Sequence, residues 1–88
     1  MKRITYVAVI EEGDRGFGAY FPDLPGCATA GDTIAETIAL ASEALQLHVL
    51  GMREDCEILP EPTGLDDIPM DPEVREIKRE LITAAIHE

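Results

Sequence analysis

The 88-residue chain is short and strongly acidic, with 7 Lys and Arg against 18 Asp and Glu and a formal net charge of −11. Nucleic acids are bound through Lys and Arg that displace counterions, so this charge excludes a DNA or RNA backbone as the direct partner and disfavours an anionic membrane surface. An apolar content of 45% is typical of a folded protein, and the length allows one domain with a modest core.

The first third of the chain predicts three strands. Residues 3–10 are rich in β-branched and aromatic side chains and are apolar on both alternating faces, which predicts an interior strand. A glycine-bearing connection follows, and residues 17–21 predict a second strand. The turn residues of 22–26, with two prolines and one glycine, end this strand. Residues 27–30 predict a short third strand.

A helix over residues 33–50 is the most securely predicted element. Thr33 and Glu36 have the spacing of a capping box, in which the threonine hydroxyl accepts from the N–H three residues later. Gly51 is the expected C-terminal stop, in the left-handed conformation. The apolar residues that follow the cap recur at spacings of three and four and predict one stripe against the sheet: Ile34, Ile38, Ala41, Leu45, Val49 and Met52.

From Arg53 onward the chain is acidic and contains prolines, which predicts a connection rather than a second domain. Asp71, Pro72 and Glu73 resemble a helix start and predict a short helix over about 72–79. The last apolar stretch, 81–86, fits either a helix tail or a strand, and periodicity over six residues does not decide between them.

We find no residue pattern for catalysis or metal binding. His48 lies inside the predicted helix and His87 beside the C-terminus, and neither accompanies a nucleophile on a loop. Cys27, His48, Cys56 and His87 are 21, 8 and 31 residues apart, which is not a zinc-ligand spacing. We therefore expect a non-enzyme without cofactor or metal. Both cysteines are expected to be free thiols, and because the chain has no targeting leader or membrane-length apolar run, we expect a cytoplasmic protein.

The acidic residues are concentrated in the second part of the chain. Residues 1–33 hold three Lys and Arg against five Asp and Glu, whereas residues 34–88 hold four against thirteen. A solvated surface that confers solubility and a binding surface for a basic partner both fit this distribution. Exposure and charge alone select the candidate partner-binding residues, on the first hairpin and after the helix: Glu11, Glu12, Asp14, Glu54, Asp55, Glu57 and Glu61.

Taken in order, these motifs resemble the HicB family of antitoxins over about residues 4–64. The most specific part is a seven-residue run followed by the helix entry: Phe21, Pro22, Asp23, Leu24, Pro25, Gly26 and Cys27, then Gly31, Asp32 and Thr33. The resemblance implies an α+β fold similar to part of ribonuclease H, a three-stranded antiparallel meander with a packed helix and a closing fourth strand beside the first. Residues 1–64 would form the antitoxin core, and 65–88 the acidic linker, the short helix and the closing strand of the same domain. This favours a strand over 81–86.

The resemblance also implies a function. The chain would be the antitoxin of a type II toxin-antitoxin system that covers a small basic HicA-type toxin, an mRNA-cleaving enzyme, by protein-protein occlusion. Most motif residues, such as Pro22, Asp23 and Gly26, would shape the turn between the second and third strands. Many family members carry a DNA-binding domain, and because this chain ends at Glu88 the expectation is a short form without direct DNA binding.

The alternative function is a stand-alone oligomeric or ligand-binding module with the same fold and no cognate toxin. Open sheet edges predict a homo-oligomer, a dimer or higher, for either function.

Overall fold

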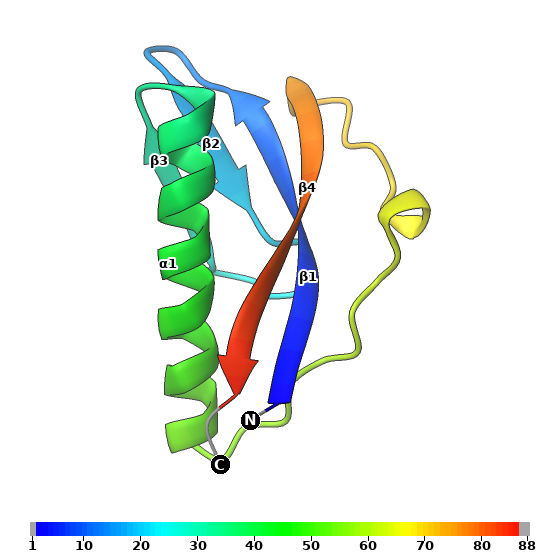
Figure 1. Ribbon diagram of the computed structural model, residues 1–88. Coiled ribbons are helices and arrows are strands. Elements are labelled where there is room, and N and C mark those ends of the chain that lie inside the picture. Colours follow the sequence, from blue (N-terminus) through cyan, green and yellow to red (C-terminus); the bar gives the residue numbers. More distant parts are fainter. Residues whose placement is uncertain (1, 87–88) are drawn as a thin grey trace.

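The computed structural model describes residues 2–86, which form a four-stranded antiparallel sheet and one long helix. The strand order in the sheet is β3-β2-β1-β4, so β1 is interior, as predicted, and β4 closes the sheet beside it (Figure 1). The predicted strands of the meander agree with the structure within two residues at each end. The elements are β1 (Lys2–Glu12), β2 (Phe17–Tyr20), β3 (Ala28–Gly31), α1 (Ile34–Glu54), the single 3-10 turn η1 (Leu65–Asp67) and β4 (Glu76–Ile86).

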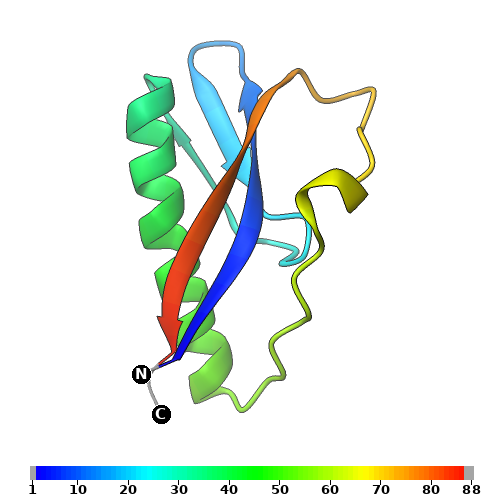
Figure 2. The same ribbon diagram turned by 45° about the vertical axis from the view of Figure 1, so that its right-hand side comes forward.

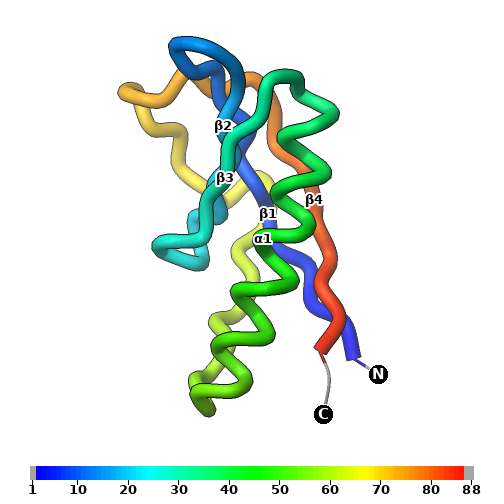
Figure 3. Tube along the Cα trace, turned by 90° about the vertical axis from the view of Figure 1, so that its left-hand side faces the viewer, coloured from blue at the N-terminus to red at the C-terminus, as the bar shows by residue number. Residues whose placement is uncertain are grey.

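Helix α1 covers one face of the sheet, and the other face is covered in part, around Val7 and Val9. Helix α1 lies on one side and the segment 55–75 on the other (Figures 1 and 2), and Figure 3 shows the helix running across the sheet. In the register of β1 with β4, Tyr6 is opposite Ile82 on the helix side, while the alternating residues Val7 and Val9 are buried on the other side. This two-sided burial explains why β1 is apolar on both faces.

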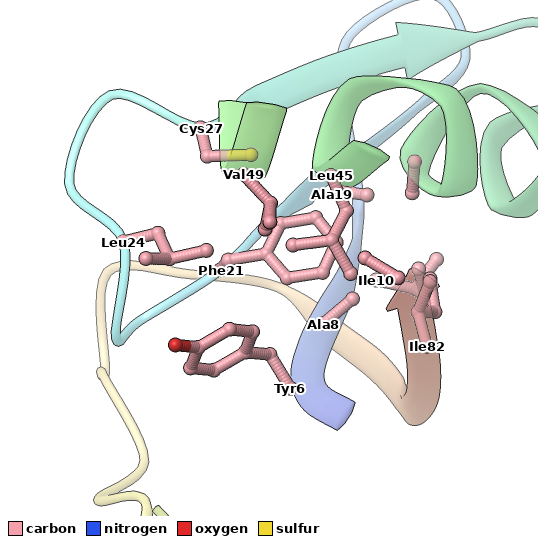
Figure 4. Close-up of a cluster of buried hydrophobic side chains, with 12 residues drawn as sticks. Tyr6, Ala8, Ile10, Ala19, Phe21, Leu24, Cys27, Leu45, Val49 and Ile82 are labelled. Carbon is pink, nitrogen blue, oxygen red and sulfur yellow. The ribbon is translucent and has the colours of Figure 1, made fainter. Parts of the chain in front are cut away.

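The core lies between the sheet and α1. It draws buried side chains from β1, β2, β4, α1 and the turn at 21–27. Figure 4 shows the Phe21 ring in the middle of the cluster, between the side chains that descend from α1 and those that rise from β1. Its members are Tyr6, Ala8, Ile10, Ala19, Phe21, Leu24, Cys27, Ala41, Leu45, Val49, Ile82 and Ala84.

The predicted helix start is confirmed. The Thr33 hydroxyl accepts a hydrogen bond from the Glu36 N–H at 3.0 Å, as a helix N-cap should. Thr37, which the apolar stripe did not include, is fully buried and donates its hydroxyl proton to the Thr33 carbonyl at 2.7 Å. A Cβ at Gly31 would lie 2.7 Å from the Thr37 hydroxyl oxygen, so the close approach of β3 to α1 requires glycine at position 31.

The predicted helix end is wrong. Gly51 lies inside α1, which runs to Glu54, and the residue in the left-handed conformation is Cys56, with φ 58°. The Glu57 N–H donates to the Met52 carbonyl at 2.8 Å and the Cys56 N–H to the Arg53 carbonyl at 3.1 Å, the two bonds of a Schellman motif. The motif usually places glycine where Cys56 stands, so the prediction selected the nearest glycine instead.

The predicted helix over 72–79 is also wrong, because β4 already begins at Glu76. Asp71 does accept from the Glu73 N–H at 2.9 Å and from the Val74 N–H at 3.0 Å, but these bonds close a single turn. A strand from Glu76 satisfies the backbone groups of β1 over nearly its whole length, which an isolated eight-residue helix cannot do. The predicted strand over 81–86 is correct and is the second half of β4.

One side chain of α1 covers the outer edge of β4. The Gln46 amide donates to the Ala85 carbonyl at 2.9 Å and accepts from the Ala85 N–H at 2.9 Å. These two bonds occupy the groups that a further strand would use at this position, and they fix the C-terminal half of α1 to the closing strand.

Candidate partner-binding surfaces

The first candidate surface is the β1–β2 hairpin, with Glu11, Glu12 and Asp14, here called the hairpin acids. The turn beside them is closed by the Gly13 N–H, which donates to the Gly16 carbonyl at 2.8 Å. Pairing of Phe17 with Gly31 brings the end of β3 against this hairpin, so Asp32 and Glu36 join Glu11 and Asp14 around one shallow groove of about 410 Å³. The sequence alone did not predict that these acids lie together. Asp32 follows the hairpin by some twenty residues, and only the strand pairing places it there.

The second candidate surface follows the end of α1, with Glu54, Asp55, Glu57 and Glu61, here called the helix-end acids. All four are exposed. The 21 residues of α1, about 30 Å of helix, separate Glu54, Asp55 and Glu57 from the end of the molecule that holds the hairpin (Figure 1). Glu61 lies farther along the returning chain, next to Pro60, whose carbonyl accepts from the Tyr6 hydroxyl of β1. The seven residues selected from the sequence therefore do not form one surface.

The motif run 21–27 folds into a compact turn. The Phe21 N–H donates to the Cys27 carbonyl at 3.1 Å, and the Cys27 N–H donates to the Leu24 carbonyl at 3.0 Å. Phe21, Leu24 and Cys27 are buried, while Pro25 and Gly26 are exposed. Gly26 has φ +89°, a conformation that glycine adopts without strain.

Three side-chain contacts attach the segment 55–75 to the sheet and its turns, and the Glu12 N–H of β1 donates to the Arg75 carbonyl at 2.9 Å. The Tyr6 hydroxyl donates to the Pro60 carbonyl at 2.7 Å, and Arg79 donates to the Leu65 carbonyl. Between them, the Asp23 carboxylate accepts from the Thr63 N–H at 2.8 Å and from the Thr63 hydroxyl at 2.6 Å. Burial raises the pKa of Tyr6, and the nearby carboxylates of Asp23 and Glu61 raise it further. The Tyr6 hydroxyl therefore remains a protonated donor at neutral pH.

Asp23→Ala is expected to destabilise the protein by about 2 kcal/mol, because two hydrogen bonds to a half-buried carboxylate are lost. Urea unfolding measures the change, and hydrogen exchange at the Thr63 amide should become faster. Asp23→Asn is the matched control, since its remaining carbonyl oxygen can keep one of the two bonds and the loss should be smaller. An alanine variant as stable as the parent chain would show that this contact does not hold the segment.

Groups that could support catalysis are sparse in the described chain. His48 is half-buried on α1, and His87 lies outside the described residues. Cys27 is buried, which raises the pKa of its thiol, whereas Cys56 is exposed, and both are free thiols. Within residues 2–86, no cluster of three or more His, Cys, Asp or Glu side chains has the geometry to hold a metal ion. No helix in that range combines the length and apolar character that crossing a membrane requires.

Comparison with known families identifies the chain. A family model described as a HicB-like antitoxin of bacterial toxin-antitoxin systems matches residues 6–87. The chain belongs to the HicB-like antitoxin family. The match covers the sheet, α1 and both candidate surfaces, and it extends beyond the 4–64 region that carried the resemblance in sequence.

Two curated relatives match much of the chain, and one of them is a HicB antitoxin. Over 73 residues the chain is 38% identical to an uncharacterized 14.9 kDa protein of Haemophilus phage HP1, which covers 83% of this chain and 55% of that one. Over 62 residues it is 34% identical to Antitoxin HicB 2 of Photorhabdus laumondii, which covers 70% and 45%. This HicB-like chain thus spans about half the length of the curated relatives it matches.

Solved structures share the HicB-like fold. A chain of the HicA3 and HicB3 toxin-antitoxin complex is 30% identical with a TM-score of 0.71, and the match covers 97% of this chain and all of that one. The N-terminal domain of the Burkholderia pseudomallei antitoxin HicB has a TM-score of 0.74 at 21% identity, with 97% and 100% coverage. A toxin-antitoxin complex from Streptococcus pneumoniae reaches 0.79 at 20% identity, covering 96% of this chain and 70% of that one.

Proposed function

We propose that this chain is the antitoxin of a type II toxin-antitoxin system and neutralises a small basic HicA-type toxin by covering its RNA-cleaving site. Family membership supports the antitoxin role, and the match to the HicA3 and HicB3 complex carries the choice of partner, because it extends over nearly all of this chain. The net charge of −11 suits a protein that must bind where RNA phosphates would otherwise lie.

Co-expression tests this proposal. The small open reading frame next to the gene of this chain is induced alone and together with it, and growth is followed. We expect growth arrest from the neighbour alone and recovery with this chain. A neighbour that encodes no small basic protein, or a growth arrest that this chain does not relieve, would refute the proposed function.

The two acidic surfaces make separate predictions for toxin binding. Because Glu54, Asp55 and Glu57 lie at the far end of α1 from the hairpin acids, a small toxin in one position faces only one of these two groups closely. Reversal to lysine of the set that faces the toxin should slow association about 10-fold or more at low salt, since opposite charges steer encounter. The difference should shrink as salt is raised.

Stopped-flow or surface-based association rates at two ionic strengths measure this effect. The triple variants Glu11→Lys, Glu12→Lys, Asp14→Lys and Glu54→Lys, Asp55→Lys, Glu57→Lys change the net charge by the same amount, so each is the matched control for the other. Equal rates for both variants and the parent chain would mean that the acids serve solubility alone.

The alternative is a stand-alone oligomeric or ligand-binding module of the same fold. Self-association through an open sheet edge remains part of both proposals, and Gln46 already covers that edge at Ala85. A thermal-shift screen in which a small molecule raises the unfolding midpoint well beyond the controls would favour this alternative.

A further inference from the structure

The C-terminal half of α1 exposes large apolar side chains. Leu47 is 68% exposed and Leu50 41% exposed, and Ile58 just beyond the helix is 92% exposed. Between Ile34 and Met52 the helix contains only two charged residues, Glu36 and Glu43. A helix that covers a sheet normally presents charged side chains to water, so the outer side of α1 has the composition of a surface that a partner covers.

Of these side chains, Leu47 borders a groove along the junction of α1 with the start of β3. Leu47 and His48 form a ridge between two adjoining depressions of about 350 and 310 Å³. One depression has small residues in its wall, Gly26, Ala28 and Ala44. The other is lined by Gly51 and Met52 and ends at the carboxylates of Asp55 and Glu57. We call these two depressions and their ridge the α1 groove.

Gly51 provides an independent observation. It lies within α1 with an ordinary helical backbone, where glycine costs about 0.5–1 kcal/mol relative to alanine. A Cβ at this position would meet nothing within 4 Å, so the packing of the described chain does not require glycine. At Gly31, by contrast, a Cβ would collide with Thr37. Glycine at position 51 therefore lowers helix stability with no packing reason within the described chain. A molecule that approaches the helix closely at the groove would explain its presence.

We propose that the α1 groove is the site at which the toxin docks, an inference that rests on the proposed function. Apolar side chains of the toxin would pack on both sides of Leu47, its backbone would approach α1 at Gly51, and its Lys or Arg side chains would meet Asp55 and Glu57. A second copy of this chain fits the groove poorly, because it would add a further net charge of −11 and bring like carboxylates together. The hairpin groove, bordered by glycines and charged side chains, lacks a comparable exposed leucine.

The test compares exposed leucines on different surfaces. Leu47→Asp in the α1 groove is expected to weaken toxin binding at least about 30-fold, the loss typical of a central interface anchor. Leu81→Asp is the matched control, because Leu81 is 60% exposed on β4, away from the groove. It should bind as the parent chain does. Affinities are measured by calorimetry with the purified protein encoded by the neighbouring small open reading frame.

Gly51 gives a second pair of variants, one that tests the cost of glycine to stability and one that tests binding. Gly51→Ala should raise the unfolding midpoint by about 4–8 °C, because alanine is the better helix former. Gly51→Gln keeps the helix and fills the depression, so it should weaken binding about 10-fold or more while the fold remains intact by circular dichroism.

Unchanged affinity in either Leu47→Asp or Gly51→Gln would overturn the docking site while leaving the proposed function in place. Failure of the parent chain to bind the toxin at all would instead refute the proposed function. A parent dimer that Leu47→Asp converts to a monomer would show that a second copy occupies the groove, which also overturns the proposal.

Discussion

Deletion of residues 80–88 is expected to abolish cooperative folding. The deletion removes the partners that β4 supplies to β1 from Lys2 to Ala8, and with them Ile82 and Ala84 from the core. The N-terminal half of β1 has no pairing with β2, which joins β1 only at Val9–Glu12, so its backbone groups lose their strand partner altogether. The free energy of unfolding of a domain of this size is about 5–10 kcal/mol. We expect the loss of the β4 strand pairing and of two core side chains to cost more than this.

Far-ultraviolet circular dichroism and urea unfolding of the truncated chain measure this effect. Two point variants of the full chain serve as controls within the same strand. Ile82→Ala, at a buried position, should destabilise by about 2–4 kcal/mol, while Leu81→Ala, at an exposed position, should change stability little. A truncated chain that unfolds cooperatively at the midpoint of the full chain would contradict the role of β4 as the closing strand.

Phe21→Ala is expected to cost about 3–5 kcal/mol, the largest effect of any single substitution considered for this chain. Phe21 is 2% exposed and lies in the middle of the core, where its ring joins α1 to β1 (Figure 4). The substitution leaves a cavity that the turn at 21–27 cannot close, because Leu24 and Cys27 are fixed by their own backbone hydrogen bonds. The unfolding midpoint should fall by roughly 12–40 °C.

Differential scanning calorimetry of Phe21→Ala, with Phe17→Ala as the matched control, checks this prediction. Phe17 is only half-buried at the start of β2, so its loss should be clearly smaller. Equal destabilisation by the two variants would mean that the core is centred elsewhere than Figure 4 indicates.

The elements that sequence predicted well are those whose signals are local. The continuous apolar run of β1 correctly predicted that its side chains are buried on both faces. Thr33 and Glu36 predicted the start of α1 to within one residue. The predicted stripe on α1 is largely correct, since Ala41, Leu45 and Val49 are fully buried. The spacing of apolar residues and the hydrogen bonds of a helix cap involve residues close together in sequence. They can therefore be predicted without knowledge of the fold.

The predictions that were wrong or incomplete depend on contacts between distant segments. The stretch 72–79 has the composition of a helix start, but the long unpaired edge of β1 makes a strand more favourable there. Cys56 adopts the left-handed conformation that sequence rules expect of glycine. The helix α1 therefore continues beyond Gly51, where its end was predicted. The bond between Asp23 and Thr63 and the approach of Asp32 to the hairpin acids arise from the return of the chain across the sheet.

Inhibition of the toxin in solution tests the central claim most directly. The purified protein encoded by the neighbouring small open reading frame is incubated with RNA while the concentration of this chain is raised, and the cleavage rate is recorded. If this chain covers the RNA-cleaving site, cleavage should fall to background at a fixed stoichiometric ratio, and Leu47→Asp should require a large excess for the same effect. RNA cleavage that continues at the full rate in a large excess of the folded parent chain would contradict the proposed antitoxin function.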